Sequence, residues 1–366
     1  MRNTSLTIKT PGKLMVAGEF AVLEPYHDLV VMAVDRFVYA RLEESDTNRL
    51  SLEDFGLHDL NWSFGVDGIE VDGEDDRVLF VQSAMSIACT YLNEKGITPT
   101  PFHLSIRSEL DDASGAKYGL GSSAAVTVSV VKAILQKHLP DSPREELVFR
   151  LASISHVTIQ GNGSGADVAA SSYGGFLRYA SFQAEWLQEA YAGAATLHGL
   201  LEKDWPYFSL EPVRLPDDIY VCVGWTGKPA STKRLVDEIL KLKTSNTGAF
   251  HEFLASSEQA VGNFLTGMQN ADTELLLEGI RKNRHALRDV GRAADTAIET
   301  PLLETLCDLA ETHGGAGKPS GAGGGDCGIA FMPSREQAER LMEAWGATSI
   351  RSLKLKPFSY GAEVVE

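Results

Sequence analysis

The feature that most constrains this chain is a glycine-containing loop that runs directly into a helix. The loop reads Lys117-Tyr118-Gly119-Leu120-Gly121, and apolar residues at helical spacing continue over residues 122–139. Glycines at 119 and 121 allow positive φ and a close approach of a ligand to the backbone. The unpaired N–H groups and the macrodipole of a helix start favour an anion. The sequence therefore predicts a phosphate site at Gly119, Leu120, Gly121, Ser122, Ser123 and Ala124.

The side chains at this helix start leave more than one interpretation open. Ser122 and Ser123 either cap the helix or offer a hydroxyl to a metal ion. Lys117 adds a mobile positive charge at the mouth of the loop. A glycine turn that merely starts a core helix is the structural alternative.

Two other phosphate-binding motifs fit this chain less well. The Walker pattern G-x-x-x-x-G-K-[ST] occurs nowhere in the sequence. The dinucleotide fingerprint G-x-G-x-x-A matches at Gly119, with Asp141 about twenty residues further on. A dinucleotide loop follows a buried apolar strand, whereas residues 110–115 form a hydrophilic linker and Asp141 lies in a turn. The dinucleotide interpretation therefore fails on its context.

The charge balance limits the partners of the chain. Its 366 residues suffice for two domains with a full hydrophobic core, and its formal net charge is −17 at pH 7. Such a negative protein is not expected to take nucleic acid or an anionic membrane as its main partner. An anionic ligand would need a local positive site, which draws attention to the lysines beside glycines: Lys13, Lys117 and Lys228.

Cysteine usage and the N-terminus bear on location. Cys89, Cys222, Cys307 and Cys327 have no metal-binding spacing, and their apolar neighbours predict buried free thiols in a reducing compartment. The N-terminus lacks the apolar core of a signal peptide. No apolar run approaches the ~18 residues of a membrane span. These features predict a cytoplasmic protein.

Hydrophobic periodicity predicts strands and helices in two blocks, residues 1–210 and 211–366. The predicted strands lie at residues 6–9, 30–34, 37–42, 102–106, 176–179, 219–223, 327–332 and 352–356, with a turn at 10–13 and a buried run at 14–19. The predicted helices lie at residues 78–93, 122–139, 143–160, 168–173, 231–243, 250–268, 273–290, 301–313 and 335–345, with capping boxes at 141–145 and 334–337. The polar residues 46–76 predict an excursion from the fold, and residues 205–215 a connector. Mixed elements in two blocks predict a two-domain α+β protein.

Three glycine-containing segments together are more specific than any one of them. Pro11-Gly12-Lys13 with Gly18-Glu19 precedes the loop at 119–124, and Gly321-Ala322-Gly323-Gly324-Gly325 follows near the end. This set resembles the galactokinase, homoserine, mevalonate and phosphomevalonate (GHMP) kinase superfamily along nearly the whole chain. Finer details are similar to the phosphomevalonate kinases: the runs at residues 18–25, 160–165, 223–227 and 320–330, and Lys117 just before the loop.

The resemblance implies a fold and an activity. The fold would be an N-terminal domain like ribosomal protein S5 domain 2, a C-terminal ferredoxin-like domain, and a site between them. The activity would be transfer of the ATP γ-phosphoryl group to (R)-5-phosphomevalonate with Mg²⁺. The partners would be the small molecules ATP and phosphomevalonate. The protein itself would be a monomer or a homodimer, and the sequence leaves both open. The alternatives are a mevalonate kinase, a diphosphomevalonate decarboxylase, or a non-catalytic relative that binds ATP or sugar.

The same resemblance assigns roles to individual residues. Lys13 and Lys117 match lysines that hold the reacting phosphates, Asp167 matches the catalytic aspartate of mevalonate kinases, and Ser123 matches a serine that reaches Mg²⁺. The implied acceptor site comprises Lys13, Glu19, Ser164, Gly165, Ser231, Thr232, Ser320, Gly321 and Ala322. His156 stands where mevalonate kinases carry a metal-binding glutamate. Because a neutral imidazole is a poor Mg²⁺ ligand, we interpret His156 as a packed or exposed helix residue.

Overall fold

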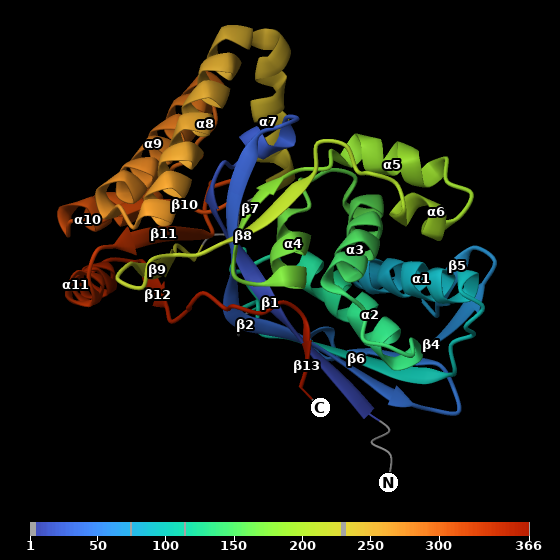
Figure 1. Ribbon diagram of the computed structural model, residues 1–366. Helices are drawn as coiled ribbons and strands as arrows, with labels where there is room; N and C mark the ends of the chain where they lie inside the picture. The colour runs from blue at the N-terminus through green and yellow to red at the C-terminus, as the bar shows by residue number, and fades with distance from the viewer. Residues whose placement is uncertain (1–4, 74, 113–114, 228–231, 366) are drawn as a thin grey trace.

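The computed structural model describes residues 5–73, 75–112, 115–227 and 232–365. Within these ranges the chain forms two β-sheets with helices packed on them, which confirms the predicted two-domain α+β fold (Figure 1). Lys228 and Ser231, named above as candidates, lie outside the described residues.

The larger sheet belongs to the N-terminal domain. Its strands run in the order β13-β1-β2-β6-β3-β4-β5, and β7 pairs with β2 and with β8. The pairing of β3 with β6 is parallel and the others are antiparallel. The strand bounds are β1 Ser5–Ala17, β2 Asp28–Glu44, β3 Arg49–Leu52, β4 Leu57–Gly65, β5 Gly68–Val71, β6 Phe102–Ser108, β7 Phe176–Ala180, β8 Ser209–Val213 and β13 Glu363–Val364.

Two long strands replace the shorter segments predicted at the N-terminus. The turn predicted at residues 10–13 is wrong, because β1 continues through it with a register shift between Pro11 and Gly12. A bulge accommodates Pro11, which has no N–H to donate to the sheet, without ending the strand. β2 likewise spans both predicted strands. In addition to β1, it pairs with β7 at residues 28–32 and with β6 at residues 38–44.

The predicted excursion at residues 46–76 is wrong, because this segment supplies β3, β4 and β5. Its few apolar side chains, among them Leu50, Leu52, Trp62 and Ile69, are buried in the core. Most other residues of β4 are exposed, so the apolar signal is sparse and resembles that of a loop. The predicted connector at residues 205–215 also contains a strand, β8.

The helices of this domain cover one face of the larger sheet (Figure 1). They are α1 Leu79–Glu94, α2 Ser122–His138, α3 Glu145–Gln160 and α4 Ala166–Tyr173, followed by the short α5 Ala184–Ala192 and α6 Leu197–Leu201. The capping box predicted at residues 141–145 is wrong. Arg144 precedes α3 without a side-chain cap from the described residues, and the Ser142 hydroxyl donates to Gln136 Oε1 instead.

The smaller sheet belongs to the C-terminal domain and is antiparallel, in the order β10-β11-β9-β12. Its strands are β9 Tyr220–Trp225, β10 Ala316–Pro319, β11 Cys327–Met332 and β12 Arg351–Leu353. Helices α10 Pro301–Thr312 and α11 Arg335–Gly346 pack on it, while α7 Thr232–Ser245, α8 Thr247–Asn270 and α9 Thr273–Ala293 rise beside it (Figure 1). The second capping box is confirmed, because Ser334 Oγ accepts from Gln337 N.

The two sheets do not divide the chain at one point. Position 210/211 falls inside β8, which pairs with β7 of the larger sheet, and the smaller sheet begins at β9. After β12 the chain returns to the first domain, where Phe358 N donates to Ala33 O at 3.0 Å and β13 pairs with β1. The C-terminal segment therefore ties the domains together.

Two predictions from composition can be compared with the structure. The four cysteines are buried free thiols, as expected. Burial raises the pKa of Cys89 and of Cys222 to about 12, so these thiols stay protonated and inert near neutral pH. In the part of the chain that the structure describes, no helix is long and apolar enough to cross a membrane.

The C-terminal tie offers a test of the fold. A Cβ at Gly361 would overlap the backbone of Ser172 and Tyr173, so we expect Gly361→Ala to lower the free energy of unfolding by about 1–3 kcal/mol. Gly262 in α8 is the matched control: no described atom lies within 4 Å of its would-be Cβ, and Gly262→Ala should stabilise by about 0.5–1 kcal/mol. Urea unfolding of both variants measures this. Equal stability of Gly361→Ala and wild type would contradict the tie.

Candidate active site

A cavity of about 770 Å³ lies where the two domains meet. Segments from both contribute to its wall: β1, the loop before α2, the end of α3, the loop before α4, the start of α7 and the loop after β10. The predicted site residues in this wall are Lys13, Glu19, Lys117, Gly119, Leu120, Gly121, Ser122, Ser123, Ser164, Gly165, Asp167, Thr232, Ser320, Gly321 and Ala322. Ala124 lies outside the described lining, because its side chain is buried in the core.

The helix start predicted to bind phosphate opens onto this cavity. Gly121 is the N-cap of α2 in the left-handed region, at φ 76°, and no side chain among the described residues caps the helix. The capping alternative for Ser122 and Ser123 is therefore wrong. Ala125 N makes the bond to Gly121 O at 3.0 Å, so the N–H groups of residues 122–124 have no acceptor within the helix. They remain available to an anion.

Lys13 explains why this loop needs a glycine at 121. Its backbone N–H donates to Leu120 O at 2.9 Å, and its Nζ donates to Gly119 O at 3.1 Å. Between these contacts the lysine stem passes over Gly121, where a Cβ would lie 2.9 Å from Cε of Lys13. The close approach that the sequence suggested for a ligand is thus made by Lys13, whose ammonium group ends beside the helix start.

His156 is a packed residue of α3, as interpreted, and it also lines the cavity. Its Nε2 shares a hydrogen bond of 3.1 Å with Oγ of Ser123, and its ring is 3% exposed. Burial lowers the pKa of His156 below 6.5, and the Asp167 carboxylate opposes that shift. A neutral imidazole therefore holds the hydroxyl that was predicted to reach a metal ion.

Asp167 lies at the start of α4, just after residues 161–165, which form the second glycine loop; the first glycine loop is residues 119–121. Its Oδ1 accepts from the N–H of Val168 at 3.0 Å, and its side chain is half-buried in the cavity wall. Tyr179 fixes the loop by donating to Ser164 O at 2.5 Å. Within the described ranges, Asp167 forms no ion pair with Lys13 or Lys117.

Lys117 lies on the exposed side of the cavity. It forms an isolated β-bridge with Asp111. Burial raises the pKa of Asp111, Lys117 opposes the shift, and Asp54 adds to it. The two predicted lysines therefore differ: Lys13 is buried and fixed, whereas Lys117 is exposed and near a carboxylate.

The third glycine loop closes the cavity from the C-terminal domain. Lys318 and Pro319 belong to β10, so the loop proper covers residues 320–326. The Ser320 hydroxyl donates to Met15 O at 2.9 Å, which ties the loop to β1. Gly321 has φ +79° and no described atom within 4 Å of its would-be Cβ, so it faces open space in the cavity wall.

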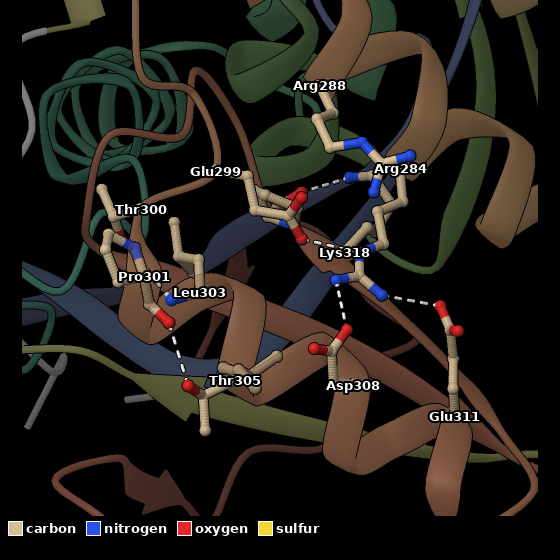
Figure 2. Close-up of polar contacts among 12 residues, drawn as sticks. Arg284, Arg288, Glu299, Thr300, Pro301, Leu303, Thr305, Asp308, Glu311 and Lys318 are labelled. Atoms are coloured by element: carbon tan, nitrogen blue, oxygen red, sulfur yellow. Dashed lines mark hydrogen bonds and ion pairs between the residues drawn. The ribbon is translucent and has the colours of Figure 1, made fainter.

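The other end of this loop is held by the segment between α9 and α10. Gly324 N donates to Ile298 O at 2.7 Å. The neighbouring Glu299 is buried against Arg284, with 2.6 Å between Arg284 Nε and Glu299 Oε1. Arg284 also binds Asp308 at 2.6 Å and Glu311 at 2.8 Å on α10 (Figure 2). An ion cluster that is buried at Arg284 and Glu299 and exposed at Asp308 thus supports this side of the site.

Part of the cavity wall comes from residues 46–76, which were predicted to be an excursion from the fold, and from the residues that follow them. Asp54, Phe55, Asp76 and Arg77 line the cavity from the region between β3 and α1, and Phe80 lines it from the first turn of α1. The guanidinium of Arg77 lies 5.4 Å from the ring centre of Phe55. No motif marks Asp54 and Phe55, because they reach the site only through the unpredicted strands β3 to β5.

The oxygen groups near Ser123 fit a shared Mg²⁺ ion better than a closed metal centre. Among the residues that the structure describes, no group of three or more His, Cys, Asp or Glu side chains could hold a metal. Ser123 and Asp167 supply a hydroxyl and a carboxylate in the same wall. Mg²⁺ typically takes one or two protein oxygens and completes its shell with phosphates and water. The site therefore suits a metal ion that is shared with the phosphate groups of a ligand.

Two sequence families and a characterised relative match the chain. Residues 80–175 match the GHMP kinases N terminal domain, and residues 264–350 match the GHMP kinases C terminal family. A phosphomevalonate kinase of Streptomyces sp. (strain CL190) is 32% identical over 360 residues, which cover 95% of this chain and 96% of that protein.

Two solved structures are similar over both domains. The Lin0012 protein from Listeria innocua is 39% identical with a TM-score of 0.92, and the match covers 99% of each chain. The phosphomevalonate kinase of Streptococcus pneumoniae, in complex with phosphomevalonate and AMPPNP, is 28% identical with a TM-score of 0.83. That match covers 96% of this chain and 99% of the other.

Two substitutions in the third loop should separate a cavity wall from a structural turn. Gly321→Val places a side chain in the open cavity, so we expect kcat for ADP formation to fall about 10²-fold or more. Its stability should fall only by the strain of a positive φ, about 1–2 kcal/mol. Gly323→Val is the control, because its Cβ would overlap Ile298, and it should unfold at a lower temperature. Equal loss of stability in both variants would contradict an open wall at Gly321.

Proposed function

The chain belongs to the GHMP kinase family, and on this premise we propose that it transfers the γ-phosphoryl group of ATP to (R)-5-phosphomevalonate. The products would be ADP and (R)-5-diphosphomevalonate, an intermediate in isoprenoid synthesis. One observation carries the proposal: the uncapped start of α2 and the ammonium group of Lys13 converge on one cavity between the domains. The relatives from Streptomyces and Streptococcus support this acceptor over others in the family.

The proposed ATP site follows from the groups at the first loop. The free N–H groups of residues 122–124 would bind the triphosphate at the positive end of the α2 macrodipole. Lys13 would bring a fixed positive charge to the reacting phosphates, and Lys117 a mobile one. Phosphoryl transfer depends chiefly on positioning and on stabilising negative charge, which is what these groups offer.

Mg²⁺ fits the same place. Ser123 would offer its hydroxyl to the ion, and His156 would orient that hydroxyl through the 3.1 Å hydrogen bond. When bound, Mg²⁺ neutralises charge on the β- and γ-phosphates. The imidazole then acts as a support for Ser123 and needs no place in the metal's own shell.

The proposed acceptor site comprises residues of the second and third glycine loops and the start of α7. Its wall is formed by Ser164, Gly165, Thr232, Ser320, Gly321 and Ala322. A phosphate monoester has a second pKa near ~6 and is largely dianionic at pH 7, so it needs no general base. Asp167 forms no ion pair with either lysine within the described ranges, so it would act by positioning the ion rather than by removing a proton.

The metal assignment is testable at Ser123. We expect Ser123→Ala to raise the Mg²⁺ concentration needed for the half-maximal rate and to lower kcat moderately, because the phosphates also hold the ion. The fold should remain intact, since Ser123 does not cap α2. Ser122→Ala is the control and should retain the wild-type Mg²⁺ dependence. Loss of circular dichroism in Ser123→Ala would instead indicate a structural role.

The relative importance of charge and base catalysis is testable at three residues. Lys13→Met and Lys117→Met should each lower kcat by about 10³-fold, as the removal of other charge-stabilising groups does. Asp167→Asn should be milder, because the proposed acceptor needs no base. The measurement is kcat at saturating ATP, Mg²⁺ and phosphomevalonate from pH 6 to 9.

The same assay decides the acceptor. The rate of ADP formation by the wild type is measured with each of three acceptors, phosphomevalonate, mevalonate and diphosphomevalonate, under the same conditions. A hydroxyl acceptor would need a base, worth about 10²–10⁴-fold. If Asp167→Asn is the most damaging variant and abolishes a carboxylate-like ionisation in the wild-type profile, a mevalonate-type kinase replaces our proposal.

A further inference from the structure

Glu19 lines the cavity, yet both of its carboxylate oxygens are bound by protein groups. Oε1 accepts from Lys318 Nζ and, at 3.3 Å, from the N–H of Gly321. Oε2 accepts from Asn283 Nδ2 at 3.0 Å. The side chain is 3% exposed, so it has little surface left for a ligand. Its partners come from β10, α9 and the third loop, all in the C-terminal domain.

Hydrogen bonds also hold the backbone on both sides of Glu19. Gly18 N donates to Asn283 Oδ1 at 3.0 Å, so Asn283 bridges two consecutive residues. Ala21 N donates to Glu19 O at 2.7 Å around Phe20, whose φ of 60° and ψ of −45° form a strained γ-turn. Phe20 itself is buried among the apolar residues of helices α7 to α9. Both side chains of this turn therefore enter the C-terminal domain.

Lys318 has no other anionic partner among the described residues and is fully buried. Burial lowers the pKa of Lys318, and the Glu19 carboxylate opposes that shift. A buried ammonium group is stable only where a carboxylate and hydrogen-bond acceptors surround it. Moving the Glu19 carboxylate away would therefore leave the buried Lys318 ammonium group without its counter-charge.

We propose that Glu19 is a positioning residue: held by Asn283 and Lys318, it fixes the N–H of Gly321 and thereby sets the third glycine loop against the cavity. Glu19 acts through Gly321 and not as a direct ligand of the acceptor, although our sequence analysis placed it among the acceptor-binding residues. This inference rests on the proposed function only for its kinetic readout.

Asn283 and Lys318 make the proposal testable, because they lie outside the described lining of the cavity. We expect Asn283→Ala and Lys318→Met to lower kcat/KM by a factor similar to that of Glu19→Gln, on the order of 10²-fold for a misplaced wall. The double variant Glu19→Gln/Asn283→Ala should be no worse than the more damaging single variant, since residues acting as a unit are not additive. If Glu19 bound the acceptor directly, only Glu19→Gln would change KM strongly, and the double variant would show additive losses.

A control separates positioning from general destabilisation. Leu341 is buried in the core of α11, α10 and β11, away from the cavity, so Leu341→Ala lowers stability without touching Glu19. All variants are assayed well below their melting temperatures. If Leu341→Ala, with a comparable drop in melting temperature, loses as much kcat/KM as Asn283→Ala, the positioning role is overturned.

A second readout does not require turnover. Amide hydrogen exchange of a peptide covering residues 319–326 reports on the loop itself. We expect exchange at least about tenfold faster in Asn283→Ala and Lys318→Met, and wild-type exchange in Leu341→Ala. Unchanged exchange in the first two variants would overturn the proposal. If the wild type turns over no acceptor, the proposed function fails, and the exchange data still decide the role of Glu19.

Discussion

The site depends on the way in which Lys13 crosses the first glycine loop. Two hydrogen bonds, from its backbone to Leu120 and from its ammonium group to Gly119, bind strand β1 to the start of α2. The glycine at 121 is needed because the lysine stem occupies the space where a Cβ would be. A single contact region therefore aligns two sources of positive potential, a side-chain cation and an uncapped helix start. Helix α2 is packed into the core of the larger sheet, so neither source can move alone.

The C-terminal domain meets this arrangement through a turn that is unfavourable by itself. A non-glycine residue held at positive φ in a sparsely populated region costs about 1–3 kcal/mol and persists only where its surroundings determine it. Phe20 meets that condition, because its side chain is buried among α7 to α9 and its neighbour Glu19 is bound to α9 and β10. The strained backbone thus lies at the junction of the domains, beside the cavity. The contacts of this turn hold strand β1 against the C-terminal domain.

Local sequence predicted the parts of the site that are written in consecutive residues. The loop with Gly119 and Gly121 leads into a helix as expected, and Lys13 and Asp167 lie in the same cavity wall. Contacts between distant residues left no such trace: Glu19 and Lys318 are separated by 299 positions, and Glu19 and Asn283 by 264. Strands β3 to β5 were missed because a half-exposed sheet edge carries few apolar residues. His156 is packed in its helix, as interpreted, but its contact with Ser123 was missed because helical periodicity does not show which hydroxyl a buried side chain contacts.

The two buried lysines beside the cavity show how a protein of net charge −17 can serve anionic substrates. Lys318 is fully buried and paired with Glu19, so its charge is balanced within the protein. Lys13 is 9% exposed, donates to a neutral carbonyl, and forms no ion pair with any residue that the structure places. Burying a charge is costly unless it is paired, and a carboxylate beside Lys13 would remove both the cost and the attraction for phosphate. Because no described carboxylate forms an ion pair with Lys13, its positive charge would remain available to the phosphates of a substrate.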